Sequence, residues 1–398
     1  MLTGILTEMR KERGLEIANT SQIVETKKGW KVPSQSGNGF YLVKSNGLEA
    51  TCTCPDFKKE NNKCKHIWAV EFLVTEKVKP RIIATKKEKY CQQWSSYDKA
   101  TTNQKFIFMK LLSDLTSLVK QPEYSKGRPS LPMSDMIYAS VMKVYTTFSL
   151  RRSMSDIEIA QSNDYLSTIP CYSSIGHFMQ KEDLTPILVN MVKLTSLPLK
   201  TVENDFAIDS TGFGTSNFQR WHSYKHGKDI RSKRWVKCHF MTGVKTNIVT
   251  SVKITSEFDN DSPQLKELVK DTLTSFDMSE ISADKAYISR NNLELIDSIG
   301  ATPFIPFKSN MHGNKKGLVW KRMYYYFMMK SDEFYEHYHK RSNAETTVHM
   351  IKSKFGGSIK AKSWNAQINE VLCKIICHNI CVLIQEMYEL DIDVNFAS

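Results

Sequence analysis

The residues best suited to binding a metal lie close together near the start of the chain. Cys52, Cys54, Cys64 and His66 form the pattern C-x-C-x9-C-x-H. Zn²⁺ prefers four soft or borderline ligands in a tetrahedron, and two close pairs joined by a loop can supply them. Because side chains fill all four positions, we expect one structural Zn²⁺ per chain and no open position for a catalytic water.

The spacing of these four ligands resembles the SWIM zinc finger. In that family a β-hairpin carries the first pair of ligands, and the start of a helix carries the second pair. A strand-like run from Ala50 to Cys54 and a helical run from His66 to Val74 fit this arrangement. Such a finger could contact DNA or another protein. The basic segment at residues 77–89 favours DNA.

A second group of polar residues has helical spacing in the C-terminal part of the chain. These residues follow one another at steps of three, four and seven, which places them within roughly a 60° arc of a helix. They are Tyr338, Arg341, Glu345 and Lys352. An apolar stripe beside them suits packing against a sheet: Ala344, Val348 and Ile351. Taken alone, the polar residues fit a solvated helix surface equally well.

Two apolar strands end on an aspartate. Residues 206–208 precede Asp209, and residues 281–283 precede Asp284. Each aspartate, taken singly, is more typical of a turn or a helix cap than of a catalyst. If both met Glu345, the three carboxylates would repel one another, and a divalent cation would remove that conflict.

Together, three motifs resemble the DDE transposases of bacterial and archaeal insertion sequences. They are D-S-T-G-F from Asp209, D-K-A-Y from Asp284, and Y-x2-R-x3-E-x6-K from Tyr338 to Lys352. The resemblance extends over roughly residues 90–390. It implies an α/β chain with a ribonuclease-H-like, mixed-sheet catalytic domain, the first Asp on the central strand and the Glu on a helix across the active site. The short gap from Asp284 to Glu345 predicts no β-rich insertion domain.

The resemblance also implies an activity, in which one site first cleaves DNA at transposon ends and then transfers the freed 3′-OH into target DNA by in-line displacement. Asp209, Asp284 and Glu345 would hold two Mg²⁺ (or Mn²⁺) ions, with Asp209 bridging them. The residues implied to bind DNA are Arg341, Lys352 and Tyr338. The implied partners are the terminal inverted repeats, target DNA and a second copy of the chain on the DNA. A transposase-derived regulator without catalysis and a nuclease that only hydrolyses remain as alternatives.

The composition agrees with a polyanionic partner. The 398 residues include 55 Lys and Arg against 42 Asp and Glu, which gives a net charge of +13. The most apolar stretch, residues 371–384, is interrupted by Lys374, His378 and Asn379, and the N-terminus meets charge after seven residues. We therefore expect no membrane span and no signal peptide. Together with the resemblance, this implies a cytoplasmic, nucleoid-associated protein.

Together with the apolar periodicity, the two resemblances imply four parts: a SWIM-type finger at 1–75, a basic linker and helix at 76–128, a helical DNA-binding region at 129–200 and the catalytic domain at 201–398. Strands are expected at 39–44, 50–54, 205–209, 235–242, 247–255, 280–283 and 302–306. Helices are expected at 66–74, 103–120, 262–276, 291–298 and from 338 onward. Strands in succession, followed by strands alternating with helices, predict a mixed α/β sheet.

Three further features have weaker signals. His349 lies one turn after Glu345, but Mg²⁺ disfavours imidazole, so we expect a surface or core position for it. The aromatic run at residues 324–327 could stack on unpaired bases but is more typical of a core. Trp235, Lys237 and His239 alternate on a predicted strand and could face DNA.

Overall fold

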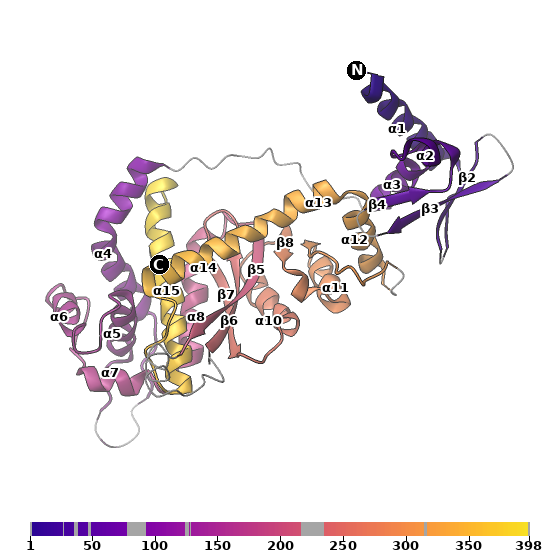
Figure 1. Ribbon diagram of the computed structural model, residues 1–398. Helices are drawn as coiled ribbons and strands as arrows, with labels where there is room; N and C mark the ends of the chain where they lie inside the picture. Colours follow the sequence, from indigo (N-terminus) through magenta and orange to yellow (C-terminus); the bar gives the residue numbers. More distant parts are fainter. Residues whose placement is uncertain are drawn as a thin grey trace, which may run out of the picture. The chain divides into compact units, whose positions relative to one another are not determined.

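The computed structural model describes most of the chain. The described residues are 2–26, 28–35, 39–46, 49–77, 93–123, 127, 129–215, 235–313 and 317–396. They divide into two compact units, one of residues 1–85 and 279–339, the other of residues 86–278 and 340–398 (Figure 1). Most of the basic segment predicted after the finger, residues 78–92, lies outside the described residues.

The first unit begins with a helix and a small antiparallel sheet. The strands pair in chain order, and the elements are α1 (Leu2–Thr20), β1 (Val24–Thr26), β2 (Gly29–Pro33), β3 (Phe40–Asn46), β4 (Glu49–Cys52), α2 (Pro55–Glu60) and α3 (Lys65–Lys77). Helix α1 packs closely on α3 at Gly14, where a Cβ would lie 2.5 Å from the Cβ of Trp68. The strands predicted at 39–44 and 50–54 and the helix α3 are confirmed.

The rest of the first unit combines a parallel strand pair with helices. β8 (Glu280–Ala283) pairs in parallel with β9 (Thr302–Phe304), and the 3-10 turn η2 (Lys285–Tyr287) and α11 (Arg290–Ser298) connect them. α12 (Leu318–Met329) and α13 (Ser331–Tyr338) follow. The aromatic run 324–327 lies on α12, where Tyr324 and Tyr326 are buried, so it belongs to the core. Among the described residues between Asp284 and Glu345, β9 is the only strand, as expected without a β-rich insertion.

The second unit combines helices with a three-stranded antiparallel arrangement. Its helices are α4 (Trp94–Ser117), α5 (Met133–Tyr145), α6 (Met154–Ser162), α7 (Tyr172–Phe178), α8 (Leu184–Ser196), the 3-10 turn η1 (Leu197–Leu199), α10 (Asp261–Leu273), α14 (Ser342–Phe355) and α15 (Trp364–Glu389). Its strands are β5 (Asp205–Gly214), β6 (Trp235–Gly243) and β7 (Val249–Ser256). The region 130–200 is mostly helical, as its periodicity predicted.

The register of β5 differs from the sequence expectation in one respect. The strand was expected to stop at Asp209, but its pairing with β6 continues from Asp209↔Phe240 to Gly214↔Trp235. Asp209 therefore lies in the middle of a strand and not at a turn. Since successive side chains of a strand point to opposite faces, Asp209, Thr211 and Phe213 share one face.

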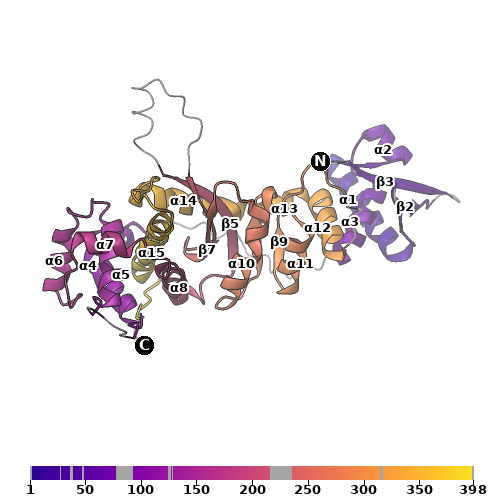
Figure 2. The same ribbon diagram turned by 90° about the horizontal axis from the view of Figure 1, so that it is seen from below.

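Helix α15 forms the core of the second unit, where it packs against α4, α5, α8 and α14 (Figure 2). By length and composition it could cross a membrane, but 89% of its apolar window is buried inside the protein. The polar residues that interrupt it have partners there. His378 donates from Nε2 to the carbonyl oxygen of Asn247 at 2.9 Å, and Asn379 exchanges hydrogen bonds with the backbone of Val249.

Candidate active site and zinc finger

One end of α14 lies against the middle of β5. Arg341, at the end of the 3-10 turn η3 (His339–Arg341) that leads into α14, donates from Nη1 to Oε1 of Glu345 at 2.8 Å. Its Nη2 lies 3.5 Å from each carboxylate oxygen of Asp209. The side chains of Asp209 and Arg341 are 16% and 18% exposed, whereas Glu345 is 61% exposed. Two of the three predicted carboxylates thus contact one guanidinium.

Lys352 reaches the same face of β5 further along α14. Its Nζ donates to Oγ1 of Thr211 at 2.7 Å and lies 5.4 Å from the ring centroid of Phe213. Burial lowers the pKa of Lys352, because the charged amine is poorly solvated there. Thr211 was not singled out from the sequence, although it lies two residues after Asp209, the spacing that places side chains on one strand face.

The apolar stripe of α14 holds the helix on the strands. Ala344 and Ile351 are buried, Val348 packs against the core, and Thr347 is also buried and donates to Oδ1 of Asn247. This confirms the predicted packing face. His349 is exposed, which agrees with one of the two positions expected for it, on the surface or in the core.

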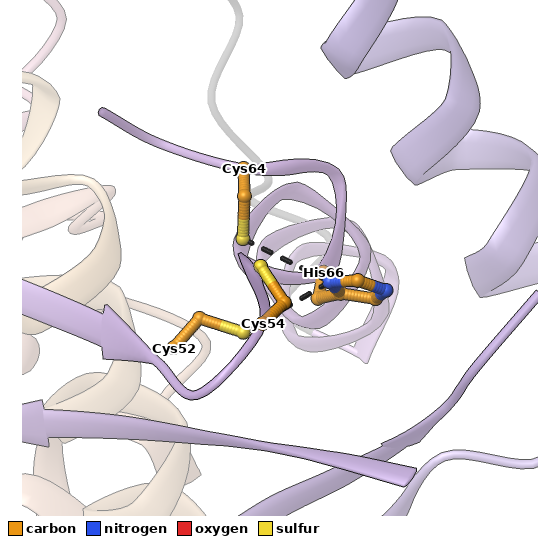
Figure 3. A group of neighbouring side chains, drawn as sticks. All are labelled: Cys52, Cys54, Cys64 and His66. Atoms are coloured by element: carbon orange, nitrogen blue, oxygen red, sulfur yellow. Dashed lines mark hydrogen bonds between the residues drawn. The ribbon is translucent and has the colours of Figure 1, made fainter. Parts of the chain in front are cut away.

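The four cysteine and histidine residues of the first unit form one buried cluster (Figure 3). Cys52 ends β4, Cys54 caps α2 by accepting from the amide of Phe57, and Cys64 and His66 lie at the start of α3. Their ligand atoms all lie within 4.8 Å of one another, and Nδ1 of His66 is 3.9 Å from the sulfurs of both Cys52 and Cys64. Tetrahedral Zn²⁺ needs ligand atoms about 3.5–3.8 Å apart, so the donors and spacing fit zinc.

The thiols of this cluster interact with one another. A hydrogen bond from Cys52 lowers the pKa of Cys64 to about 4, while that bond and burial raise the pKa of Cys52. Zinc binds cysteine as the thiolate. The lowered pKa of Cys64 thus favours the form of the sulfur that zinc binds.

Residues 200–380 match the family model described as "Transposase DDE domain", and residues 37–74 match the one described as "SWIM zinc finger". The chain carries a transposase DDE domain. The match spans Asp209, Asp284 and Glu345 and implies the ribonuclease-H-like fold predicted from the sequence. Antiparallel pairing of β5, β6 and β7 and parallel pairing of β8 and β9 agree with a mixed α/β class. The two matches support transposase function in general, DNA binding and a structural zinc.

The helix that was expected to run unbroken from Tyr338 to Lys352 is interrupted. α13 ends at Tyr338, and the 3-10 turn η3 precedes α14. Within that turn Lys340 forms a 2.7 Å ion pair with Asp205 at the start of β5. Tyr338 thus belongs to α13, where its ring packs on Tyr335. Its role in DNA binding stays a prediction.

Asp284 follows β8 in the first compact unit. Its Oδ1 accepts the amide of Lys285 at 2.6 Å and caps the turn η2. This is the capping geometry that the sequence left open as an alternative. The cap uses one carboxylate oxygen, and the role of Asp284 as a metal ligand stays a prediction.

One expectation about β6 is wrong. Trp235, Lys237 and His239 do alternate along the strand, but His239 is fully buried and cannot face DNA. Its Nε2 bonds Oγ1 of Thr255 at 2.9 Å, and its Nδ1 lies 3.2 Å from Asp261 on α10. Burial lowers the pKa of His239 to about 4. The alternation correctly placed the three side chains on one face of β6, but it did not show that α10 packs on that face.

Proposed function

We propose that this transposase cleaves DNA strands at the ends of an insertion sequence and joins the freed ends to target DNA by in-line phosphoryl transfer. Asp209, Asp284 and Glu345 are the proposed catalytic residues. The observation that supports this most directly is the contact of Arg341 with both Asp209 and Glu345. Since one cation already contacts both carboxylates, their positions on β5 and α14 suit a shared positive charge.

The donor chemistry of the three residues fits Mg²⁺ or Mn²⁺. Carboxylate oxygens are the hard ligands that these ions accept. When bound, two such ions would activate the attacking oxygen and stabilise the leaving oxygen of the displacement. The exposed side chain of Glu345 faces solvent from which DNA can approach.

Arg341 and Lys352 are the proposed phosphate-binding residues of the site. The planar guanidinium of Arg341 can bond two phosphate oxygens at once, whereas the ammonium of Lys352 acts as a point charge. Both lie on the side of α14 that faces β5, so they can hold a strand along the line from Asp209 to Thr211. Holding the reacting groups in line supplies much of the rate enhancement expected in such a site. Tyr338 is proposed to pack on the DNA beside them.

The other parts of the chain are proposed to bind the ends of the element. We assign the finger to residues 1–75, the basic linker and helix to 76–128, the helical DNA-binding region to 129–200 and the catalytic domain to 201–398. The terminal inverted repeats and target DNA are the proposed ligands. Two copies of the chain are proposed to act together on DNA, at the nucleoid of a prokaryotic cell.

The test uses duplex DNA that carries the inverted repeats flanking the gene, with Mg²⁺ and a target plasmid. Asp209→Asn, Asp284→Asn and Glu345→Gln are each expected to abolish cleavage while DNA binding, measured by gel shift, is retained. Glu267→Gln on α10 is the matched control and should cleave normally. Full cleavage by any of the three variants refutes the catalytic assignment. Nicks without joined products would indicate a hydrolytic nuclease, and binding without nicks a regulator.

A further inference from the structure

Two buried charged residues of α15 have no part in the chemistry proposed above. Glu370 and Lys374 are one helical turn apart and are 3% and 2% exposed. Burial of a charged group is costly unless hydrogen bonds and an opposite charge compensate for it. From the sequence alone, Lys374 is visible only as an interruption of an apolar stretch. Its contacts show which part of the fold needs it.

The amine of Lys374 holds the backbone that follows α14. Its Nζ donates to the carbonyl oxygens of Gly356 and Ser358, at 2.7 Å each. Gly356 ends α14 with a positive φ of 81°, and its amide bonds the carbonyl oxygen of Lys352 at 2.9 Å. Gly356 therefore links Lys374 to the last turn of α14, which carries Lys352.

The segment that Lys374 holds, residues 356–361, also pairs with the end of β5. The amide of Gly214 donates to Gly357, and the amide of Ile359 donates to the carbonyl oxygen of Gly214 at 2.8 Å. Glu370 accepts the amides of Lys360 and Ala361, the latter at 2.9 Å. Glu370 and Lys374 thus fasten the 356–361 segment, and with it the end of α14, to α15, while the backbone of the segment pairs with the last residue of β5.

Phe213 connects this clamp to the active-site face. Its buried ring lies on the same face of β5 as Asp209 and Thr211, and the amines of Lys352 and Lys374 each lie 5.4 Å from its centroid. A cation over an aromatic face is attracted by the ring. Phe213 and Thr211 thereby hold the amine of Lys352, while Lys374 fixes the backbone that follows α14.

We propose that Lys374 is a positioning residue, which fixes the 356–361 segment on β5 and so places the ammonium of Lys352 for phosphate binding. This inference rests on the proposed function of Lys352. The charged groups that face Lys374 are Glu370 on its own helix, Lys143 on α5, whose Nζ is 3.9 Å from Glu370, and Lys360 of the segment. Lys374 acts through hydrogen bonds and not through contact with DNA.

The experiment is a double-mutant cycle on single-turnover cleavage of a bound transposon end. Lys374→Met is expected to slow cleavage about 10–100-fold with little change in DNA affinity, since small misplacements in a catalytic site cost about that much. In a Lys352→Met background the same change should slow cleavage less than about twofold, because coupled residues are not additive. Fully additive losses would overturn the proposal, since they indicate general destabilisation. Ile380→Ala, a buried change further along α15, is the matched control for stability and should show additive effects.

A second measurement separates this inference from the proposed function. Hydrogen exchange at the amide of Ile359 should be faster in Lys374→Met than in the wild type and in Ile380→Ala, whether or not the protein cleaves DNA. Unchanged protection there would refute the clamp even in an active enzyme. If Lys374→Met does not fold, Lys374→Gln, which keeps one donor group, is used in its place. Its effects on cleavage and on exchange should be of the same kind but smaller. Inactivity of the wild type with fast exchange in the variant would reject the catalytic proposal and keep the clamp.

Discussion

His378 allows a quantitative test of how the core of the second unit is held together. The residue is 1% exposed, and its Nε2–H donates to the carbonyl oxygen of Asn247 in the turn between β6 and β7. Asn247 adopts a positive φ of 63° in that turn. Burial lowers the pKa of His378 from 6.5 to about 4, because a charged imidazole is poorly solvated inside the protein.

The direction of the pH effect follows from which state binds the proton more tightly. The fold keeps His378 neutral, so the unfolded chain takes up the proton first as the pH falls through 6.5. The stability from this neutral histidine is complete above that pH and is lost progressively until about pH 4. The two pKa values differ by 2.5, and each unit is worth about 1.4 kcal/mol. Allowing for half-titration at pH 4, the expected loss between pH 7 and pH 4 is about 3 kcal/mol.

The variant that tests this is His378→Gln, which keeps an N–H donor near the position of Nε2 but does not titrate. Unfolding by urea, followed by circular dichroism, is measured at pH 7, 5.5 and 4. The wild type should lose about 3 kcal/mol more unfolding free energy than the variant over this range. Equal losses in the two proteins would refute a buried, neutral His378.

The comparison with a variant is needed because Glu386 titrates in the opposite sense. Burial, and then the neighbouring charge of Glu203, raise the pKa of Glu386 to about 7, so the fold holds this carboxyl neutral. Its contribution falls as the pH rises from 4.5 towards 7, which masks part of the histidine effect in the wild type. Glu386→Gln is the matched control and should change the slope with pH in the direction opposite to His378→Gln.

Three further outcomes are expected. Cys54→Ser, or zinc removal by a chelator, should unfold residues 37–74 and leave the second unit folded, as judged by limited proteolysis; a folded finger without metal would contradict a zinc site. Gly243→Ala should destabilise the protein by about 1–3 kcal/mol in thermal denaturation, since its Cβ would lie 2.3 Å from Cδ of Glu203, and an unchanged midpoint would show that Glu203 can move. DNA affinity should fall about a thousandfold between 50 and 200 mM salt if six or more phosphates are contacted; an affinity insensitive to salt would contradict a phosphate-binding role for the excess positive charge.

The elements of the fold were predictable where alternation or periodicity was strong. Strands β6, β7 and β8 and helix α11 lie within two residues of their expected bounds. The expected end of β5 was wrong because the apolar run stops before Asp209, which is typical of a turn, whereas pairing with β6 carries the strand on to Gly214. Helix α12 was missed because its aromatic run lacks a clear helical period, and its rings instead pack on other aromatic rings, as Trp320 does on Phe307 of the segment before the helix. Pairing partners and aromatic packing are tertiary effects that local patterns do not contain.

The residues of the candidate site were likewise predictable from local spacing only in part. Spacing alone indicated that Arg341, Glu345 and Lys352 lie along one side of a helix. In the structure, Arg341 and Lys352 contact side chains of β5. Spacing did not show the 3-10 turn before α14, nor that Thr211 accepts a hydrogen bond from the amine of Lys352. It also gave no sign that a lysine in an apolar helix holds the loop after α14. The contact of Lys352 with Thr211 joins segments 141 residues apart, and those of Lys374 join α15 to a loop 16 and 18 residues earlier in the chain, so a local pattern contains neither.

The contact between Arg341 and the two carboxylates connects the electrostatics of the site with its proposed chemistry. Asp209 is largely buried, so its negative charge requires a nearby cation, and in the protein alone Arg341 supplies one at 3.5 Å. That distance is longer than a strong charge-assisted hydrogen bond, whereas the bond from Arg341 to Glu345 is short. Arg341 therefore contacts Asp209 more weakly than it contacts Glu345. In the proposed function, a divalent cation bound by the two carboxylates would release the guanidinium of Arg341 to a DNA phosphate, so metal and DNA would each stabilise the arrangement that the other needs.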